Sequence, residues 1–523
     1  MRDRTAVAII VAIWLIPVLI WLRPGITRPD GVGYFAYLPS TYLDHDLVLF
    51  NEWQRFGMLP NGFVASSRVA ANGHLVDHWA AGSAVVWYPA FLLADVLHDG
   101  FARDGVSLPY NAAAIAVSAL AGLVALLTGF AIARRFFDTA SSLAATIATW
   151  LGSSIMWYST REALMAHAIG AAVCALVVLA SLENDALAAG IASGLAFAVR
   201  PQNATFILVP IILVGARKWV PVAGILIGAL PQIVVTVVLY GNPLKLFNVA
   251  PGNSEWHSFE RIWIWEPLLS WYHGLAPWTP LMMIGAAGML LLFRVHARLA
   301  TAAVLMFALQ WFINSTIDRP FWGGSSFGQR RFDNCTILFL VGLAAIFAIV
   351  PRWVAIAIAA IGSAWTMALF LAAQSLDLNR YIAPDALLAA VVRSPKPVGF
   401  LVSVPPNFRI TVLIVFVAVA VLYALIALSI CAKPAPVAGT ICVLLAAWFV
   451  ICGLNDPAHL QAWSGVIARN RALLPDSGAR RDHIALMRDE EDYLRRTGRT
   501  SAADATAKEI NEMIAHATSS GLR

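Results

Sequence analysis

The stretch ITVLIVFVAVAVLYALIALSIC, residues 410–431, contains 22 residues and no charged side chain. An α-helix rises about 1.5 Å per residue and needs about 20 apolar residues to cross the hydrocarbon core of a bilayer. The stretch therefore predicts a transmembrane helix. Lys433 follows almost directly and marks the expected cytoplasmic end, because basic residues gather on that side of a membrane.

The composition of the whole chain agrees with this helix. Of 523 residues, 59% are hydrophobic and 13% are charged, which excludes a single water-soluble domain of this length. Apolar runs recur between short polar segments, so we expect an all-α polytopic membrane protein with about 11–13 transmembrane helices. The net charge of +6 comes from basic residues scattered between these runs, which is typical of orientation signals and argues against nucleic acid as a partner.

The beginning of the chain sets the expected orientation. Arg2 and Arg4 precede an apolar run at residues 6–22 with no small-residue cleavage site behind it, which predicts an uncleaved anchor and a cytoplasmic N-terminus. Residues 23–109 then form a long first outer loop. Within this loop, residues 82–97 are short and apolar and are interpreted as a juxtamembrane helix that lies along the outer surface or dips into the membrane.

A break interrupts one of the apolar segments. Residues 186–199 and 204–214 are each too short to cross, and Arg200-Pro201-Gln202-Asn203 joins them. Proline breaks a helix, and a charged break at membrane depth is tolerated only where protein or water covers it. We therefore expect a re-entrant hairpin, with Arg200 facing an internal cavity.

The patterning divides the chain into three parts. Residues 1–350 form the main membrane module. Residues 351–452 add C-terminal transmembrane helices and an outer loop at 373–409, and residues 453–523 form a polar, helix-prone tail expected on the outer, periplasmic side. The five cysteines lack metal-ligand spacing and are interpreted as small core residues.

Two basic residues are predicted on the side where such residues are disfavoured. Arg330 and Arg331, in WGGSSFGQRRF (residues 322–332), lie at the outer mouth of an expected span. A guanidinium at membrane depth is costly unless an anion meets it, and its planar fork suits a phosphate. The preceding glycines let the backbone approach a bulky ligand. In the alternative, both arginines pair with Asp318, Asp333 or lipid headgroups and only anchor the helix.

The first outer loop begins with an acidic, aromatic stretch. RPDGVGYFAYLPSTYLDHDLVLF, residues 28–50, contains three aspartates and follows a membrane exit. One interpretation is an interfacial belt in which tyrosines lie at headgroup level and the aspartates only solvate a loop. The other is a catalytic site, with Asp30 as its main carboxylate and Asp46 in reserve.

The order of these motifs resembles the GT-C glycosyltransferases, in particular a bacterial branch related to the protein mannosyltransferase and lipid A aminoarabinose transferase groups. The resemblance covers residues 1 to about 350 and is carried by DGVGYFAYLP (30–39), AGSAVVWYPAFLLAD (81–95), RPQN (200–203), YHGLAPWTP (272–280) and WGGSSFGQRRF. It implies a GT-C-like fold in the bacterial inner membrane, a periplasmic active site and inverting transfer of a sugar from a polyprenyl-phosphate donor. Many relatives carry an adjacent acidic pair where this chain has Asp30-Gly31, so the resemblance leaves metal use open.

The chemistry of such a transfer fits these residue types. Displacing a phosphate from an anomeric carbon needs a carboxylate base for the acceptor hydroxyl and cations for the departing phosphate. We assign Asp30 as the base and Arg330, Arg331 and Arg200 as phosphate-binding residues; no cofactor is required, although a divalent metal remains compatible. Further substrate-pocket contacts are predicted at Tyr34, Tyr37, Asp46, His273, Trp322 and Gln329.

Other functions compete with this one. Broken helices and buried arginines also suit a transporter or flippase of lipid-linked sugars, although no inverted repeat is visible. An O-antigen-type polymerase is a second alternative, with its main basic loops later in the chain, and a purely structural membrane protein is a third. For the transferase, the expected partners are the lipid-linked sugar donor, membrane lipids and a glycan, lipid or protein acceptor.

Overall fold

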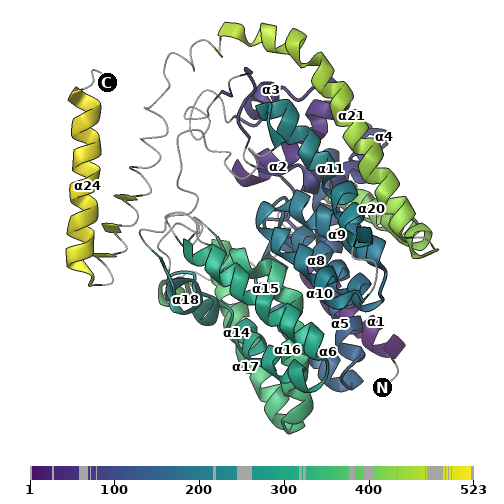
Figure 1. Cartoon of the computed structure of the whole chain (residues 1–523), viewed down its shortest axis with the longest axis vertical. Helices are drawn as coiled ribbons and strands as arrows, with labels where there is room; N and C mark the ends of the chain where they lie inside the picture. Colours follow the sequence, from purple (N-terminus) through teal and green to yellow (C-terminus); the bar gives the residue numbers. More distant parts are fainter. Residues whose placement is uncertain are drawn as a thin grey trace.

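The computed structural model is a helical bundle (Figure 1). It describes residues 3–523 apart from 26–28, 58–68, 71, 78, 216–218, 244–261, 317–320, 322–325, 376–382, 394–404, 433, 466, 468–483, 485–486, 489–490, 493, 496–497 and 520–523. Within the described part, extended pairing is limited to one isolated bridge between Val69 and Leu75. The expectation of an all-α polytopic chain is confirmed.

Eight helical segments are long and apolar enough to cross a membrane. They are α1 (Asp3–Trp21), α5 (Leu108–Arg134), α11 (Trp219–Tyr240), α15 (Ala297–Thr316), η5 with α16 (Arg330–Cys335 and Thr336–Ile349), α17 (Arg352–Ser375), α20 (Pro406–Ala432) and α21 (Pro434–Ala462). Each coincides with an apolar run that the sequence marks as a span. Helix α20 contains the uncharged stretch 410–431, as predicted.

Shorter apolar helices fill the spaces between the long ones. They are α4 (Gly82–Val96), α8 (His167–Leu182), α9 (Ala186–Val199), η2 with α10 (Pro201–Ile207 and Leu208–Leu213) and α14 with η4 (Pro280–Gly288 and Met289–Arg294). The apolar run 140–158 is long enough for one span, but it forms two helices, α6 (Thr139–Leu151) and α7 (Ile155–Thr160). Helix α5 lies at the centre and contacts α4, α6, α7, α8, α16 and α20.

Close helix contacts depend on positions without a side chain. At Gly194 of α9, an added Cβ would lie 2.1 Å from the carbonyl oxygen of Ile225 in α11. At Gly228 of α11, it would lie 2.1 Å from the carbonyl oxygen of Ile191. Small residues at such crossings let two helix backbones approach closely. Helices in a membrane associate through such packing, because lipid is as apolar as their side chains and the hydrophobic effect does not drive them together. The α9–α11 pair thereby fixes where the break after α9 lies.

Helix α4 is more deeply packed than a surface helix would be. Trp87, Ala90 and Phe91 are fully buried, and α4 contacts α5, α9 and α2. An added Cβ at Gly82 would lie 2.2 Å from the main chain at Ala198, the last turn of α9. The segment 82–97 is therefore a helix, as predicted, but its aromatic side chains face the bundle.

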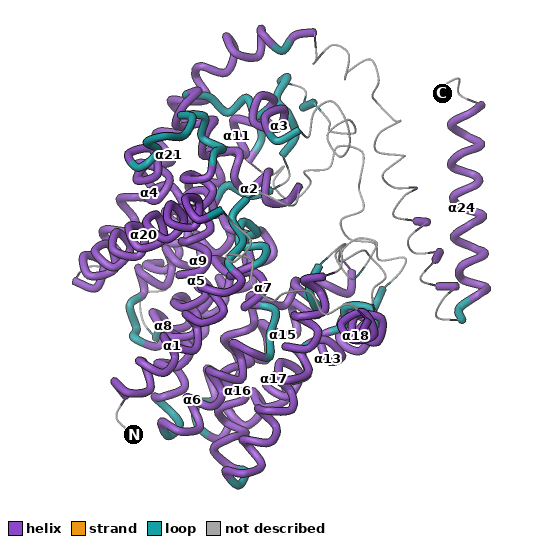
Figure 2. The backbone as a smooth tube through the Cα atoms, turned by 180° about the vertical axis from the view of Figure 1, so that it is seen from behind, coloured by secondary structure: helices purple, strands orange, loops and turns teal. Residues whose placement is uncertain are grey.

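Two short helices between α1 and α4 lie at one end of the molecule. Helix α2 (Pro29–Pro39) and helix α3 (Phe50–Arg55) lie at the end opposite to the N-terminus in both views (Figures 1 and 2). At the N-terminal end, Asp3 Oδ1 accepts a hydrogen bond of 2.9 Å from Arg134 Nε at the end of α5. The start of α1 and the end of α5 thus share one face of the bundle, and α2 lies towards the other.

The α9–α11 crossing supplies a stability test. Gly228→Val places branched atoms against the backbone of Ile191, and we expect it to destabilise the protein by about 1–3 kcal/mol or more, because overpacking forces the helices apart. Gly215→Val is the matched control, since an added Cβ there meets nothing within 4 Å. Thermal stability in detergent, followed as the monodisperse fraction on size-exclusion chromatography, measures the difference. Equal midpoints for the two variants would contradict this packing.

Candidate active site

Residues 300 positions apart meet in one ion pair. Arg330 Nη1 donates to Asp30 Oδ2 at 2.8 Å, and the Arg330 and Asp30 side chains are 16% and 29% exposed. Asp30 lies in the first turn of α2, and Arg330 is the first residue of η5. A partly buried charge-assisted bond of this length satisfies both groups. The structure therefore brings the predicted carboxylate and one predicted guanidinium together.

Tyr34 lies one helical turn after Asp30, on the same face of α2. Burial raises the pKa of the Tyr34 hydroxyl to about 12, and the charges of Arg200, Asp30, Arg330 and Asp77 also act on it. The phenol therefore stays protonated at neutral pH and can donate a hydrogen bond. These electrostatic interactions place Tyr34 near both arginines and the carboxylate.

Arg200 lies at the predicted break. Helix α9 ends at Val199, Arg200 is extended, and η2 begins at Pro201. Arg200 Nη1 lies 3.1 Å from His167 Nδ1, and Nη2 donates to Gln202 Oε1 at 3.1 Å. The helix break therefore supplies a cation to the same region as the Asp30–Arg330 pair.

Arg331 takes a different direction from Arg330. Its Nη1 donates to the main-chain carbonyl of Phe321 at 3.3 Å, and its own carbonyl accepts from Gln202 Nε2 at 2.8 Å. Gln329 Nε2 also donates to the Phe321 carbonyl at 3.3 Å. Arg331 and Gln329 thus hold the chain at Phe321, while Arg330 faces Asp30.

Asp333, one of the two carboxylates of the anchoring alternative, has close partners other than Arg330 and Arg331 among the described residues. It is 3% exposed, and it accepts a short hydrogen bond from Ser154 Oγ. Its Oδ2 lies 3.1 Å from His167 Nδ1. Asp318, the other carboxylate considered as an anchor, lies outside the described residues.

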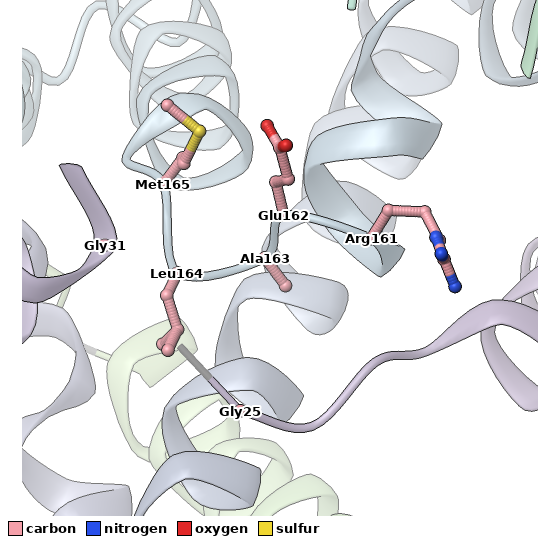
Figure 3. Close-up of a pocket in the computed structure, with 7 residues that line it drawn as sticks. All are labelled: Gly25, Gly31, Arg161, Glu162, Ala163, Leu164 and Met165. Carbon is pink, nitrogen blue, oxygen red and sulfur yellow. The ribbon is translucent and has the colours of Figure 1, made fainter. Parts of the chain in front are cut away.

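A small open pocket lies beside the ion pair. It has a cavity volume of ≈ 10 Å³, about that of one water molecule, and is lined by Gly25, Gly31 and residues 161–165 (Figure 3). Figure 3 shows the wall made by the loop between α7 and α8, with Leu164 directed towards Gly25. Met165 Sδ, in the same wall, lies 3.7 Å from Arg330 Nη1. The pocket therefore reaches the atoms of the candidate site.

The remaining predicted residues have other positions. Tyr37 is buried and donates to the Trp79 carbonyl at 2.9 Å. His273 is buried and stacks on Trp278, and burial, with the charge of Arg330, lowers its pKa to about 3, so the ring is neutral. Trp322 lies outside the described residues.

Asp46, the reserve carboxylate, belongs to a second cluster. It accepts from Ser40 Oγ at 2.9 Å and pairs with His459 at the polar end of α21. In the same cluster, His74 Nε2 and Asp456 Oδ2 lie 2.7 Å apart. These contacts tie α21 to the first outer loop, and the structure shows no contact of Asp46 with Asp30 or Arg330 among the described residues.

Two residues of the site carry little signal in the sequence. His167 is the first residue of an apolar helix, where a lone histidine is as easily explained by packing. Glu162 is buried in the loop 161–166, and its charge acts on Arg330. Its position between two expected spans marked it as an outer carboxylate, but not as a neighbour of Arg330. Among the described residues, no group of three or more His, Cys, Asp or Glu side chains forms a metal-binding cluster.

Comparison with known proteins yields one structural likeness. No protein-family model matches the sequence, and no curated protein sequence matches it. ArnT from Cupriavidus metallidurans, solved bound to undecaprenyl phosphate, is similar over 88% of this chain and 78% of that chain, with 13% sequence identity and a TM-score of 0.47. This likeness concerns the path of the chain and assigns no role to any residue.

The ion pair predicts energetic coupling between its members. Asp30→Asn and Arg330→Gln combined should cost less stability than the sum of the two single changes, with a coupling of about 1 kcal/mol or more, because each single change leaves a charge without its partner. Lys508 and Glu512 form the control pair, which is exposed and 3.9 Å apart and should couple by less than about 0.5 kcal/mol. Thermal midpoints of the four proteins in each cycle give the two values. Additive effects of Asp30→Asn and Arg330→Gln would show that the pair is not formed.

Proposed function

We propose that the protein is an integral membrane glycosyltransferase of the GT-C kind that transfers a sugar from a polyprenyl-phosphate donor to an acceptor hydroxyl. The observation that carries this proposal is the 2.8 Å contact between Asp30 and Arg330, beside Tyr34 and Arg200. A carboxylate and two guanidiniums in one partly buried region are the groups that this reaction needs.

In the proposed reaction, Asp30 is the base and the arginines bind the phosphate. The acceptor hydroxyl gives its proton to Asp30 while its oxygen forms a bond to the anomeric carbon. The bond from that carbon to the phosphate oxygen breaks on the opposite face, so the configuration inverts. The electron pair leaves with the phosphate, which changes from a diester to a monoester and gains negative charge. Arg330 and Arg200 stabilise this charge, so the leaving group needs no protonated acid.

Arg330 has two successive partners in this scheme. Without the sugar donor, it bonds Asp30 Oδ2 and so orients the carboxylate. The phosphate of a bound donor competes for the same guanidinium, because Arg330 carries five N–H groups and suits a phosphate as well as a carboxylate. Sharing Arg330 with the phosphate releases a lone pair of Asp30 for the acceptor proton. The ion pair therefore links donor binding to preparation of the base.

The site suits a reaction at a membrane surface. Helix α2 lies at the end of the bundle away from Asp3, whose N-terminal segment the charge pattern assigns to the cytoplasm (Figure 1). We place the site on the periplasmic face of a bacterial inner membrane, where a polyprenyl chain stays in the lipid and its phosphate lies at headgroup depth. A small pocket bounded by Gly31 and residues 161–165 lies next to the ion pair.

The base assignment is tested by Asp30→Asn. It should lower the rate of sugar transfer in purified protein by about 10²–10⁴, the range that general base catalysis contributes, with normal expression and membrane insertion. Asp385→Asn is the matched control, an exposed aspartate on α18 (Pro384–Arg393) that bonds Trp271, and its transfer rate should stay near that of the wild type. Glycosidic bond formation in detergent is the measurement, because transport has no meaning there. Undiminished transfer by Asp30→Asn would remove Asp30 from the chemistry.

The directions of the two adjacent arginines predict unequal roles. Arg330→Gln should raise the KM for the lipid-linked sugar and lower kcat, each by about tenfold or more, because Arg330 faces Asp30. Arg331→Gln should have a smaller effect, since its guanidinium bonds the Phe321 carbonyl. Arg330→Lys keeps the charge without the planar fork and should be intermediate. Steady-state kinetics with varied sugar donor separate the three variants, and a larger loss in Arg331→Gln than in Arg330→Gln would reverse the assignment.

A further inference from the structure

We infer that His167 is a positioning residue: its ring nitrogen Nδ1 alternates between Arg200 and Asp333, so protonation of His167 releases Arg200 to bind the donor phosphate. The inference rests on the proposed function, because the phosphate bound by Arg200 is that of the lipid-linked sugar. It adds to that function a coupling between proton uptake and substrate binding.

The geometry around the ring is closely defined. His167 Nδ1 lies 3.1 Å from Arg200 Nη1 and 3.1 Å from Asp333 Oδ2. The ring stacks on Tyr158, with centroids 4.2 Å apart, and is 3% exposed. It also donates a hydrogen bond to the main-chain carbonyl of Arg330. The stack and this bond keep Nδ1 between the guanidinium and the carboxylate.

One nitrogen cannot satisfy both partners in the same protonation state. Arginine only donates hydrogen bonds, so Arg200 requires a lone pair on Nδ1, as in the neutral ring. An ionised carboxylate only accepts, so Asp333 requires a proton on Nδ1 whenever Asp333 is itself ionised. When the ring carries a proton on both nitrogens, it bonds Asp333 and the Arg330 carbonyl, and its positive charge repels Arg200. When it is neutral, it holds Arg200.

The other charged and titratable groups around His167 bond partners other than Nδ1. Ser154, beside α7, donates to the far oxygen of Asp333 and leaves Oδ2 facing the ring. Gln202 of η2 bonds the second nitrogen of Arg200 at 3.1 Å. The positive charge of Arg330 also acts on the ring. The negative charges of Asp30, whose Oδ2 lies 2.8 Å from Arg330 Nη1, and of Glu162 oppose this effect. The phenol of Tyr158 bonds the main chain at Phe327.

Binding of a phosphate and protonation of His167 therefore favour each other. A phosphate that draws Arg200 away leaves Nδ1 next to Asp333, where a proton is stabilised. In the opposite direction, a protonated ring frees Arg200 for the phosphate. Such linkage is reciprocal, and coupling between two sites is commonly about 5–150-fold in affinity. Phosphate binding should thus tighten as the pH falls.

The experiment measures binding of farnesyl methyl phosphate to the full-length protein in detergent, by isothermal titration calorimetry, between about pH 5.5 and 8. This probe is a phosphodiester, so it lacks the second ionisation near pH 6 of a phosphomonoester, and its charge is constant over the range. Farnesol, which has no phosphate, is the reference ligand. Variation of affinity with pH therefore comes from the protein.

The wild type is expected to bind the phosphodiester about tenfold more tightly at the acid end of the range. His167→Phe keeps the stack on Tyr158 but has no ring nitrogen, so its affinity should not vary with pH. His167→Gln should fold equally well and also lose the variation, since its amide can accept from Arg200 without titrating. His296→Asn is the control: this histidine bonds Leu299 at the start of α15, outside the site, and the pH dependence should remain.

The possible outcomes separate the two proposals. Phosphate-dependent binding that is the same at all pH values in the wild type would overturn the role of His167 and leave the proposed function standing. Retention of the pH dependence in His167→Phe would do the same. If the wild type binds farnesyl methyl phosphate no better than farnesol at any pH, the phosphate site itself is wrong, and both proposals fail.

Discussion

A partly buried charge needs a counter-charge, and the Asp30–Arg330 pair meets that requirement for both of its members. Transferring either group alone out of water costs several kcal/mol, whereas a bonded pair offsets much of that cost. The partners come from the first turn of α2 and the first residue of η5, 300 positions apart. The pair therefore fixes the first outer loop against the segment that follows α15. Neighbouring features of the site, including the pocket wall at Met165, are arranged around this contact.

The polar groups of the site share a structural property: they lie at the ends of helices. Arg200 lies at the break between α9 and η2, His167 begins α8, and Asp30 lies in the first turn of α2. Helix interiors satisfy their own backbone bonds and can stay apolar, whereas helix ends leave backbone groups free and are the natural place for polar side chains. Short and interrupted helices thus bring several ends, with their polar side chains, to one place. The α9–α11 contact, closed at Gly194 and Gly228, holds the Arg200 break in position.

Much of the fold could be predicted from the sequence, because length and hydropathy are local properties. The short apolar segment expected at 186–199 coincides with α9, and the break at Arg200 follows from Pro201. The division of 140–158 into α6 and α7 could not be predicted, since Ser154 bonds Asp333, which is 179 positions away. The burial of α4 could not be predicted either, because hydropathy does not distinguish an aromatic face that contacts lipid from one that contacts α5.

The candidate site was predictable in its residue types but not in its contacts. Wrong-side charge selected Arg330, and the acidic stretch at residues 28–50 selected Asp30. The same stretch also suggested Asp46, which pairs with His459 and lies in another cluster. A lone histidine in an apolar run, such as His167, resembles packing until Asp333 and Arg200 are seen beside it. Tertiary contacts between distant segments decide these cases, and a single sequence does not report them.

The contrast between Arg330 and Arg331 shows how local geometry divides the work of two identical side chains. Both lie in η5, a 3-10 helix (Arg330–Cys335), in which three residues complete a turn and adjacent side chains point about 120° apart. When Arg330 faces Asp30, Arg331 must therefore point elsewhere, and it bonds the Phe321 carbonyl that Gln329 also bonds. Arg331 then stabilises the chain that leads into η5, and Arg330 stays directed at Asp30. The geometry of η5 therefore directs two adjacent arginines to different partners, Asp30 and the Phe321 carbonyl.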